Sequence, residues 1–205
     1  MQIDHLVFAA ADLQTGREWM TRMLGVPPGG AGQHPLMGTH NALWSLGDCY
    51  LEVIAVDPAV TAQRTRWFGL DDPAVQKSLA DGPRLLTWVA RVNDLHQRLH
   101  EIALPVGPAV RVTRAGLHWD LSVRDDGALL QGGRVPTLIE WPADVVTPEI
   151  SLPDGGVSLE NIAISDASAP LLTAVADVPK VQHIASGPAL RATFATPRGS
   201  VTLTS

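Results

Sequence analysis

The chain carries one short pattern twice, and this repeat constrains its fold more than any other feature. "IDHLVFAAADL" begins at Ile3 and "LLTWVARVNDL" begins at Leu85. In each copy an apolar run typical of a strand leads into an acidic residue that can cap a helix. Aligning Asp12 with Asp94 places His5 over Thr87. Because a repeated unit of this size is one supersecondary structure, the repeat predicts two similar modules side by side.

The residues after each copy extend the repeat. In the first module the helix is expected to end at Gly25, and the residues at 27–38 read as a glycine-rich loop. Two strands follow, joined by a turn at Gly47-Asp48. The second module reads as a strand, a helix and three further strands. The pattern therefore predicts an α+β fold of tandem βαβββ modules.

These units divide the chain into a domain at 1–141, a linker and a C-terminal unit. Within the domain, module one covers 1–57, an insertion covers 58–83 and module two covers 84–141. The proline-rich linker covers 142–157. The C-terminal unit, 158–205, reads as a weaker third βαβββ-like module. There Glu160 or Asn161 falls near the position of His5, and a one-residue change of register would exchange them.

Composition narrows the class of protein. The 205 residues carry a net charge of −6 without a run of Lys or Arg, which disfavours a nucleic-acid partner. No apolar run approaches the roughly 20 residues that cross a bilayer, so we expect no membrane partner. A single cysteine, Cys49, and the lack of a signal-peptide pattern favour a cytoplasmic protein.

Tandem βαβββ units with His on a first strand and Glu on a last strand resemble the vicinal oxygen chelate superfamily. The closer resemblance is to its glyoxalase-like domain family, through "IDHLVFAAADL", "GTHNALWSLGDCYLEVIAVDP", "RWFGLD", "GPRLLTWVARV" and "PTLIEW". The resemblance implies a cupped mixed sheet with a divalent metal ion, Mn, Fe, Ni, Co or Zn, in the cup. It implies His5, Glu52 and Glu140 as metal ligands, with Thr87, a poor ligand, at the fourth position. In such a site the metal acts as a Lewis acid and Glu140 can serve as general base.

A second group of candidates surrounds the glycine-rich loop. His34, Thr39, His40 and Asn41 supply donors and acceptors for a small molecule, and His40 is a candidate catalytic residue with Glu140. The alternative is that Thr39 and Asn41 satisfy the backbone of the loop itself. Thr87, Trp88 and Arg114 complete the predicted substrate-binding set.

Some of these side chains have a second interpretation. Trp88, Trp119 and Trp141 form either the wall of a pocket or part of the core or a dimer interface. Arg114 and Arg134 either bind a substrate carboxylate or lie solvated at the surface.

Two functional hypotheses follow. The first is a metal-dependent lyase, isomerase or dioxygenase-type enzyme that acts on a small oxygenated metabolite. The alternative is a non-catalytic protein of the bleomycin-resistance type that binds or sequesters a small molecule. A scaffold that serves mainly for dimerisation is a weaker third reading. We expect a homodimer, and the sequence leaves open whether the modules pair within one chain or between two.

Overall fold

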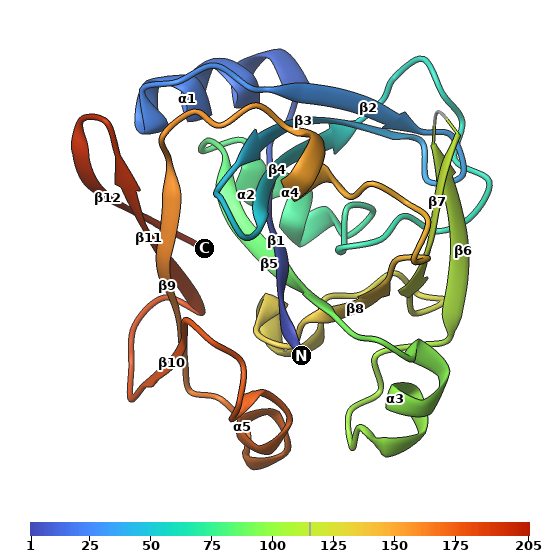
Figure 1. Cartoon of the computed structure of the whole chain (residues 1–205). Coiled ribbons are helices and arrows are strands. Elements are labelled where there is room, and N and C mark those ends of the chain that lie inside the picture. The colour runs from blue at the N-terminus through green and yellow to red at the C-terminus, as the bar shows by residue number, and fades with distance from the viewer. Residues whose placement is uncertain (115) are drawn as a thin grey trace.

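The computed structural model describes residues 1–114 and 116–205, and its centre is an eight-stranded mixed sheet built by two βαβββ modules (Figure 1). The first module consists of β1 (Gln2–Ala9), α1 (Leu13–Leu24), β2 (Gly30–His34), β3 (Thr39–Ser45) and β4 (Tyr50–Val56). The second consists of β5 (Arg84–Arg91), α3 (Leu95–Glu101), β6 (Ala109–Arg114), β7 (Leu117–Ser122) and β8 (Thr137–Glu140). The short helices α2 (Pro73–Leu79) and η1 (Leu130–Gly133) lie in connecting segments. The predicted α+β fold of tandem modules is confirmed.

Local signals set the ends of α1 as predicted. The Asp12 carboxylate accepts a hydrogen bond from the Thr15 N–H at 2.8 Å, and Gly25 ends the helix with a φ of 78°. The glycine-rich residues 27–38 differ from the prediction, because five of them form β2 instead of a loop. β2 pairs antiparallel with β3 at the edge of the sheet. Its glycines weaken the sequence signal of a strand but leave the backbone free to pair.

The strand register supports the alignment of the two modules. The strands run in the order β2-β3-β4-β1-β5-β8-β7-β6, so the first strands of the two modules pair antiparallel at the centre. In that pairing His5 lies opposite Val89 and Val7 lies opposite Thr87. Because His5 aligns with Thr87 and Val7 aligns with Val89, the two pairs occupy equivalent positions in the two modules.

The sheet curls until its two edge strands, β2 and β6, approach each other. Its inner face encloses an apolar core that includes Val7, Val89 and Ile139. Trp67, Phe68 and Leu70 enter this core from the insertion between the modules. The outer face packs against the helices and the C-terminal unit. The sheet is therefore nearly a barrel whose interior is largely filled by its own side chains.

The C-terminal unit follows α4 (Pro148–Ser151) and has the predicted element order. It consists of β9 (Ser158–Ser165), α5 (Ala169–Val175), β10 (Val181–Ile184), β11 (Leu190–Thr196) and β12 (Gly199–Thr204). Its strand order, β10-β9-β11-β12, places the first strand inside the sheet, whereas in module one the first strand pairs with the last. Phe194 packs against Phe8 with ring centroids 6.4 Å apart, so this unit covers the outer face of the barrel. None of the helices in the described residues is both long enough and apolar enough to span a bilayer.

Candidate functional site

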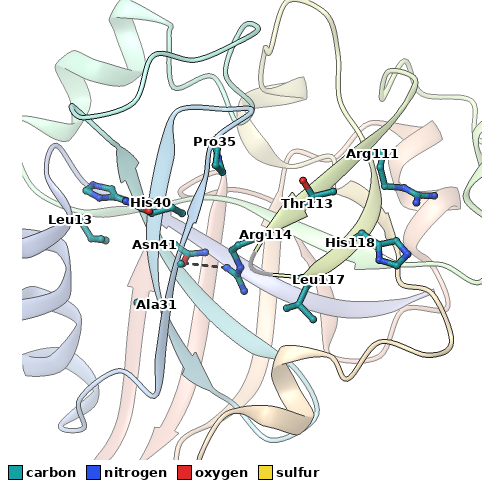
Figure 2. A pocket seen from close by; sticks show the side chains of 13 residues that line it. Leu13, Ala31, Pro35, His40, Asn41, Arg111, Thr113, Arg114, Leu117 and His118 are labelled. Atoms are coloured by element: carbon teal, nitrogen blue, oxygen red, sulfur yellow. Dashed lines mark hydrogen bonds between the residues drawn. The ribbon is translucent and has the colours of Figure 1, made fainter.

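A cleft of about 1040 Å³ opens where the two edges of the barrel meet (Figure 2). One wall comes from β2 and β3 and carries His40 and Asn41, while the other comes from β6 and β7 and carries Arg111 and Arg114. A volume of this size accommodates a metabolite or a drug-sized molecule.

A much smaller chamber lies beneath the cleft, inside the barrel. Its volume of about 30 Å³ is the share of one water molecule in the liquid. His5, Tyr50 and Glu52 line it from β1 and β4. Asn41 and Arg114 line both the chamber and the cleft, so these two side chains separate the buried groups from the open space.

A continuous series of polar side chains runs from the chamber to the cleft, and we call it the polar chain: Asp4, His5, Glu52, Asn41 and Arg114. His5 Nδ1 lies 2.7 Å from Asp4 Oδ1, and His5 Nε2 lies 3.8 Å from Glu52 Oε2. Asn41 Nδ2 donates to Glu52 Oε1 at 2.5 Å. Asn41 Oδ1 in turn accepts from Arg114 Nη1 at 3.4 Å.

A β-bulge in β1 explains how two adjacent residues join this chain. The pairing with β5 passes from Ile3 to His5, which leaves Asp4 as the extra residue. In a regular strand adjacent side chains point to opposite faces, but a bulge can re-aim one of them. Asp4 is completely buried, and its carboxylate also accepts from Trp141 Nε1 at 3.0 Å and from Arg91 Nε at 2.7 Å. The bulge thereby places a carboxylate directly behind the imidazole of His5.

The surroundings keep Asp4 ionised. Burial acts to raise the pKa of this carboxyl group, but the hydrogen bond and charge of His5, together with the charge of Arg91, outweigh it and lower the pKa. Arg91 is held in turn by Glu149 at 2.5 Å. An ionised Asp4 accepts the Nδ1–H of His5, which leaves Nε2 directed at Glu52.

Two further ring groups in the chamber stay neutral. Tyr50 stacks on His5 with ring centroids 4.5 Å apart, and burial, followed by the charges of Asp4 and Glu52, raises its pKa well above the usual value. Burial, followed by the charge of Arg114, lowers the pKa of His34 to about 3. His34 Nδ1 contacts Thr39 Oγ1 at 3.1 Å, and its ring meets Trp67 edge-on.

The family described as "Glyoxalase-like domain" matches residues 3–177, most of the chain. This chain is a member of that family. The match includes both modules, the linker and the first strand and helix of the C-terminal unit. No curated protein matches the sequence of this glyoxalase-like protein.

Solved structures share its fold at low sequence identity. A hypothetical protein from Staphylococcus aureus is 14% identical with a TM-score of 0.57, over 98% of this chain and 84% of that one. Methylmalonyl-CoA epimerase from Mycobacterium tuberculosis is 23% identical with a TM-score of 0.43, over 68% and 87%. A variant of the epimerase from Streptomyces coelicolor, in complex with 2-nitronate-propionyl-CoA, is 19% identical with a TM-score of 0.43, over 69% and 97%. The first of these shows that the fold extends over nearly the whole glyoxalase-like chain.

The structure does not bring the three predicted metal ligands together. His5 and Glu52 face each other, but Glu140 accepts the Leu95 N–H at 3.0 Å at the start of α3. Its neighbours Ile139 and Trp141 line the chamber, so Glu140 projects from the opposite face of β8.

Strand register supplies the reason for this correction. Val7 pairs with Glu52 in the first module, and the equivalent Val89 pairs with Thr137 in the second. Thr137, three residues before Glu140, therefore occupies the position that matches Glu52. Matching "YLEV" to "LIEW" therefore shifts β8 by three residues. Because a shift by an odd number of residues moves a side chain to the other face of the sheet, Glu140 does not point where Glu52 does.

The remaining donor set does not fit a catalytic metal centre. Within residues 1–114 and 116–205, no group of three or more His, Cys, Asp or Glu side chains could hold an ion. His5 and Glu52 offer two ligands, fewer than the three protein ligands that catalytic zinc sites use. Arg114 also places a fixed positive charge on the same chamber.

The chamber around His5 and Glu52 is the first cup of the barrel, and we call its equivalent around Thr87 and Thr137 the second cup. The second cup holds about 30 Å³, as the first does. Thr87 Oγ1 donates to the Gly133 carbonyl at 3.0 Å, which holds the last residue of η1 against Thr87. The second cup is closed by the protein's own chain.

The other predicted residues lie in different places. His40 faces the cleft, with Nδ1 3.9 Å from Asp57 Oδ2. Trp88 is buried among the residues of the outer face, and its Nε1 donates to the Arg134 carbonyl. Arg134 Nε donates to the Ser165 carbonyl and so joins module two to the C-terminal sheet. Trp119 and Trp141 do line the chamber.

The sequence analysis did not predict that Asp4 and Tyr50 belong to the site, or that Trp67 and Phe68 of the insertion line the chamber. An aspartate inside an apolar strand, directly before the histidine, was an available signal for Asp4. Tyr50 lies two residues before Glu52 on the same face of β4, as strand periodicity would indicate.

Proposed function

We propose that this glyoxalase-like protein is an isomerase or lyase that transfers a proton on a small oxygenated metabolite bound in the cleft. The observation that carries the proposal is the polar chain, in which Asp4, His5 and Glu52 are almost completely buried beneath that cleft. Buried ionisable groups in this arrangement stabilise a fold no better than apolar side chains would. Such clusters are typical of sites where proton transfer takes place.

Each member of the chain has a distinct role in the proposal. Glu52 accepts a proton from a carbon next to a carbonyl group, and the electron pair of that C–H bond moves to the carbonyl oxygen. Asn41 and Arg114 donate hydrogen bonds to the oxygen that gains charge. Asp4 fixes the ring of His5, whose Nε2 can exchange a proton with Glu52 or with the substrate. The substrate reaches Glu52 when the hydrogen bond between Asn41 and Glu52 opens.

Deuterium exchange provides a test that does not require the natural substrate. The protein is incubated in D₂O with a panel of 2-oxo acids and 2-hydroxy acids, and loss of the C–H signal beyond that in a protein-free sample is followed by proton NMR. We expect exchange in at least one compound and its loss in Glu52→Gln. Glu140→Gln is the matched control, because Glu140 lies outside the chamber and should leave exchange in place.

Two results would contradict the enzyme proposal. One is that folded wild-type protein exchanges no compound in the panel. The other is that exchange persists in Glu52→Gln and disappears in Glu140→Gln, which would move the chemistry to the opposite face of β8.

A second function, binding without turnover, is favoured by one specific observation. Asn41 and Arg114 separate the chamber, which holds about 30 Å³, from the cleft outside, which holds about 1040 Å³. A ligand can therefore fill the cleft without reaching His5. Tight binding of a panel compound, with no exchange in the wild-type protein, would support sequestration over catalysis.

A further inference from the structure

Arg114 crosses from one edge of the barrel to the other. It is the last residue of β6, and its side chain lies on Gly32 of the opposite edge strand β2. A Cβ atom at Gly32 would come within 2.6 Å of Arg114 Cδ and 2.7 Å of Nη1. Gly32 is paired with Asn41 in the sheet, and Figure 2 shows the guanidinium of Arg114 directed at Asn41. The glycine in β2 is thus what makes room for the arginine.

Arg114 forms no ion pair with any residue that the structure describes, because no carboxylate among them lies within ion-pair distance. Within residues 1–114 and 116–205 its guanidinium has one long hydrogen bond, 3.4 Å to Asn41 Oδ1, and lies 5.8 Å from the centroid of the Trp119 ring. Most donors of this half-buried group therefore remain available to a ligand.

Arg111 offers a contrast on the same wall of the cleft. Its Nε and Nη2 donate to the two carboxylate oxygens of Asp120 at 2.6 Å and 2.8 Å. Arg111 already forms a bidentate contact with a carboxylate, whereas Arg114 does not. If the cleft attracts an anion, Arg114 and not Arg111 must supply the specific contact.

We propose that the cleft binds an amphipathic carboxylate, with the carboxylate on Arg114 and the apolar part along the cleft walls. The planar fork of a guanidinium matches the two oxygens of a carboxylate. Leu13, Pro35 and Leu117 line the space beside it and suit a hydrocarbon or aromatic tail. That this ligand is also the substrate rests on the proposed function, since Asn41 links the Arg114 position to Glu52.

The test uses hexanoate and hexanamide, which share a tail and differ in charge. Calorimetric titration of the full chain should show binding of hexanoate, with hexanamide at least about tenfold weaker. Arg114→Met should weaken hexanoate binding by a similar factor, while Arg111→Met should leave it within about twofold. Circular dichroism and a thermal melt of each variant establish that it is folded.

Gly32→Ala is a second variant that keeps the charge of Arg114. The added methyl group must push the guanidinium away from Asn41, because the side chain is the flexible partner in that contact. We expect hexanoate to bind several times more weakly to this variant as well. If Arg114→Met fails to fold, the Gly32→Ala result decides the proposal.

Three results would overturn this inference: no binding of hexanoate at millimolar concentration, equal binding of hexanoate and hexanamide, or unchanged binding in both Arg114→Met and Gly32→Ala. Inorganic phosphate that displaces hexanoate at equal concentration would also overturn it, in favour of a general anion site. Hexanoate binding without deuterium exchange in any panel compound contradicts the enzyme proposal alone. Exchange that persists in Arg114→Met contradicts the role of Arg114 in the proposed proton transfer, and the hexanoate titrations alone decide the carboxylate inference.

Discussion

The two cups occupy equivalent positions in one barrel and share a backbone feature, yet their side chains differ in kind. In the first cup a bulge at Asp4 brings Asp4 and His5 together beside Glu52. In β5 the pairing passes from Thr87 to Leu85, so Leu86 is the extra residue at the equivalent position. The same bulge therefore accompanies the carboxylate of Asp4 and the imidazole of His5 in the first cup. In the second it accompanies the apolar side chain of Leu86 and the hydroxyl of Thr87. The backbone sets where side chains point, and the chemistry depends on which side chains are there.

The cups are also closed in different ways. Side chains line the first cup, and two of them, Asn41 and Arg114, separate it from the cleft. Side chains that again include Phe68 line the second cup, and in addition the backbone of Gly133 lies against the carbonyl of Leu86. Backbone packed as closely as Gly133 against Leu86 cannot move without local unfolding. We therefore expect the first cup to open to a ligand more readily than the second.

The largest predicted effect comes from breaking the backbone closure of the second cup with Gly133→Ala. Gly133 has a φ of 86°, and a Cβ there would lie 1.9 Å from the Leu86 carbonyl oxygen. The backbone conformation alone costs about 1–2 kcal/mol, and relief of the clash adds about 3 kcal/mol or more. Urea unfolding should show a loss of about 4 kcal/mol or more in the free energy of unfolding.

Gly47→Ala separates these two contributions. Gly47 has the same φ of 86° but no heavy atom within 4 Å of the added carbon. This variant should lose only about 1–2 kcal/mol. Equal losses in the two variants would show that the backbone of η1 does not close the second cup.

The next effect tests the first cup. Asp4→Ala leaves Arg91 and His5 buried without their carboxylate, and we expect a loss of about 3 kcal/mol in the free energy of unfolding. Because the pKa of Asp4 is lowered in the fold, the advantage of the wild type is full above the unfolded value of 3.8. It should shrink as the pH falls below that value.

Asp120→Ala is the control for this variant, because it breaks the solvent-exposed pair with Arg111. Its effect should be much smaller, since water screens an exposed pair. A loss as large in Asp120→Ala as in Asp4→Ala would mean that burial of Asp4 does not determine its contribution.

Local patterns predicted much of this fold, and the long-range contacts explain what they missed. The start and end of α1 follow from Asp12 and Gly25, and the repeat follows from two strand-to-helix boundaries. Those signals depend on residues within a few positions of each other. The pairing of β8 depends instead on the whole segment before it, because the chain that leads to Thr137 includes η1 and differs from the segment before Glu52. The position equivalent to Glu52 was therefore misassigned to Glu140.

The candidate site was predicted in its parts and not in its connections. His5, Glu52, Asn41 and Arg114 were all candidates, and the structure joins them. Asp4 entered only through a bulge, which changes the face of one residue and leaves no periodic pattern in the sequence. The contact of Arg114 with Gly32 depends on closure of the barrel, which joins residues from opposite edges of the sheet.

An acid-stability measurement provides a third comparison of the cups. Folding lowers the pKa of His34, which lines the first cup, from 6.5 to about 3, so the unfolded chain binds a proton that the folded chain does not. Stability should therefore fall as the pH drops below 6.5, by about 1.4 kcal/mol per pH unit from this residue. His34→Phe should remove that part of the slope in urea unfolding between pH 7 and pH 5. An unchanged slope would mean that His34 is protonated within the fold.

The smallest predicted effect comes from Thr87→Val in the second cup. The hydroxyl of Thr87 has a partner within the chain, the Gly133 carbonyl, and valine has nearly the same shape. We expect a loss of about 1 kcal/mol in the free energy of unfolding. We expect no change in the acid-stability slope, in hexanoate binding or in deuterium exchange. Thr87 was a predicted substrate contact, so this variant also tests whether the second cup takes part in the chemistry. A loss of exchange with hexanoate binding intact would place Thr87 in the reaction and make the two cups parts of one site.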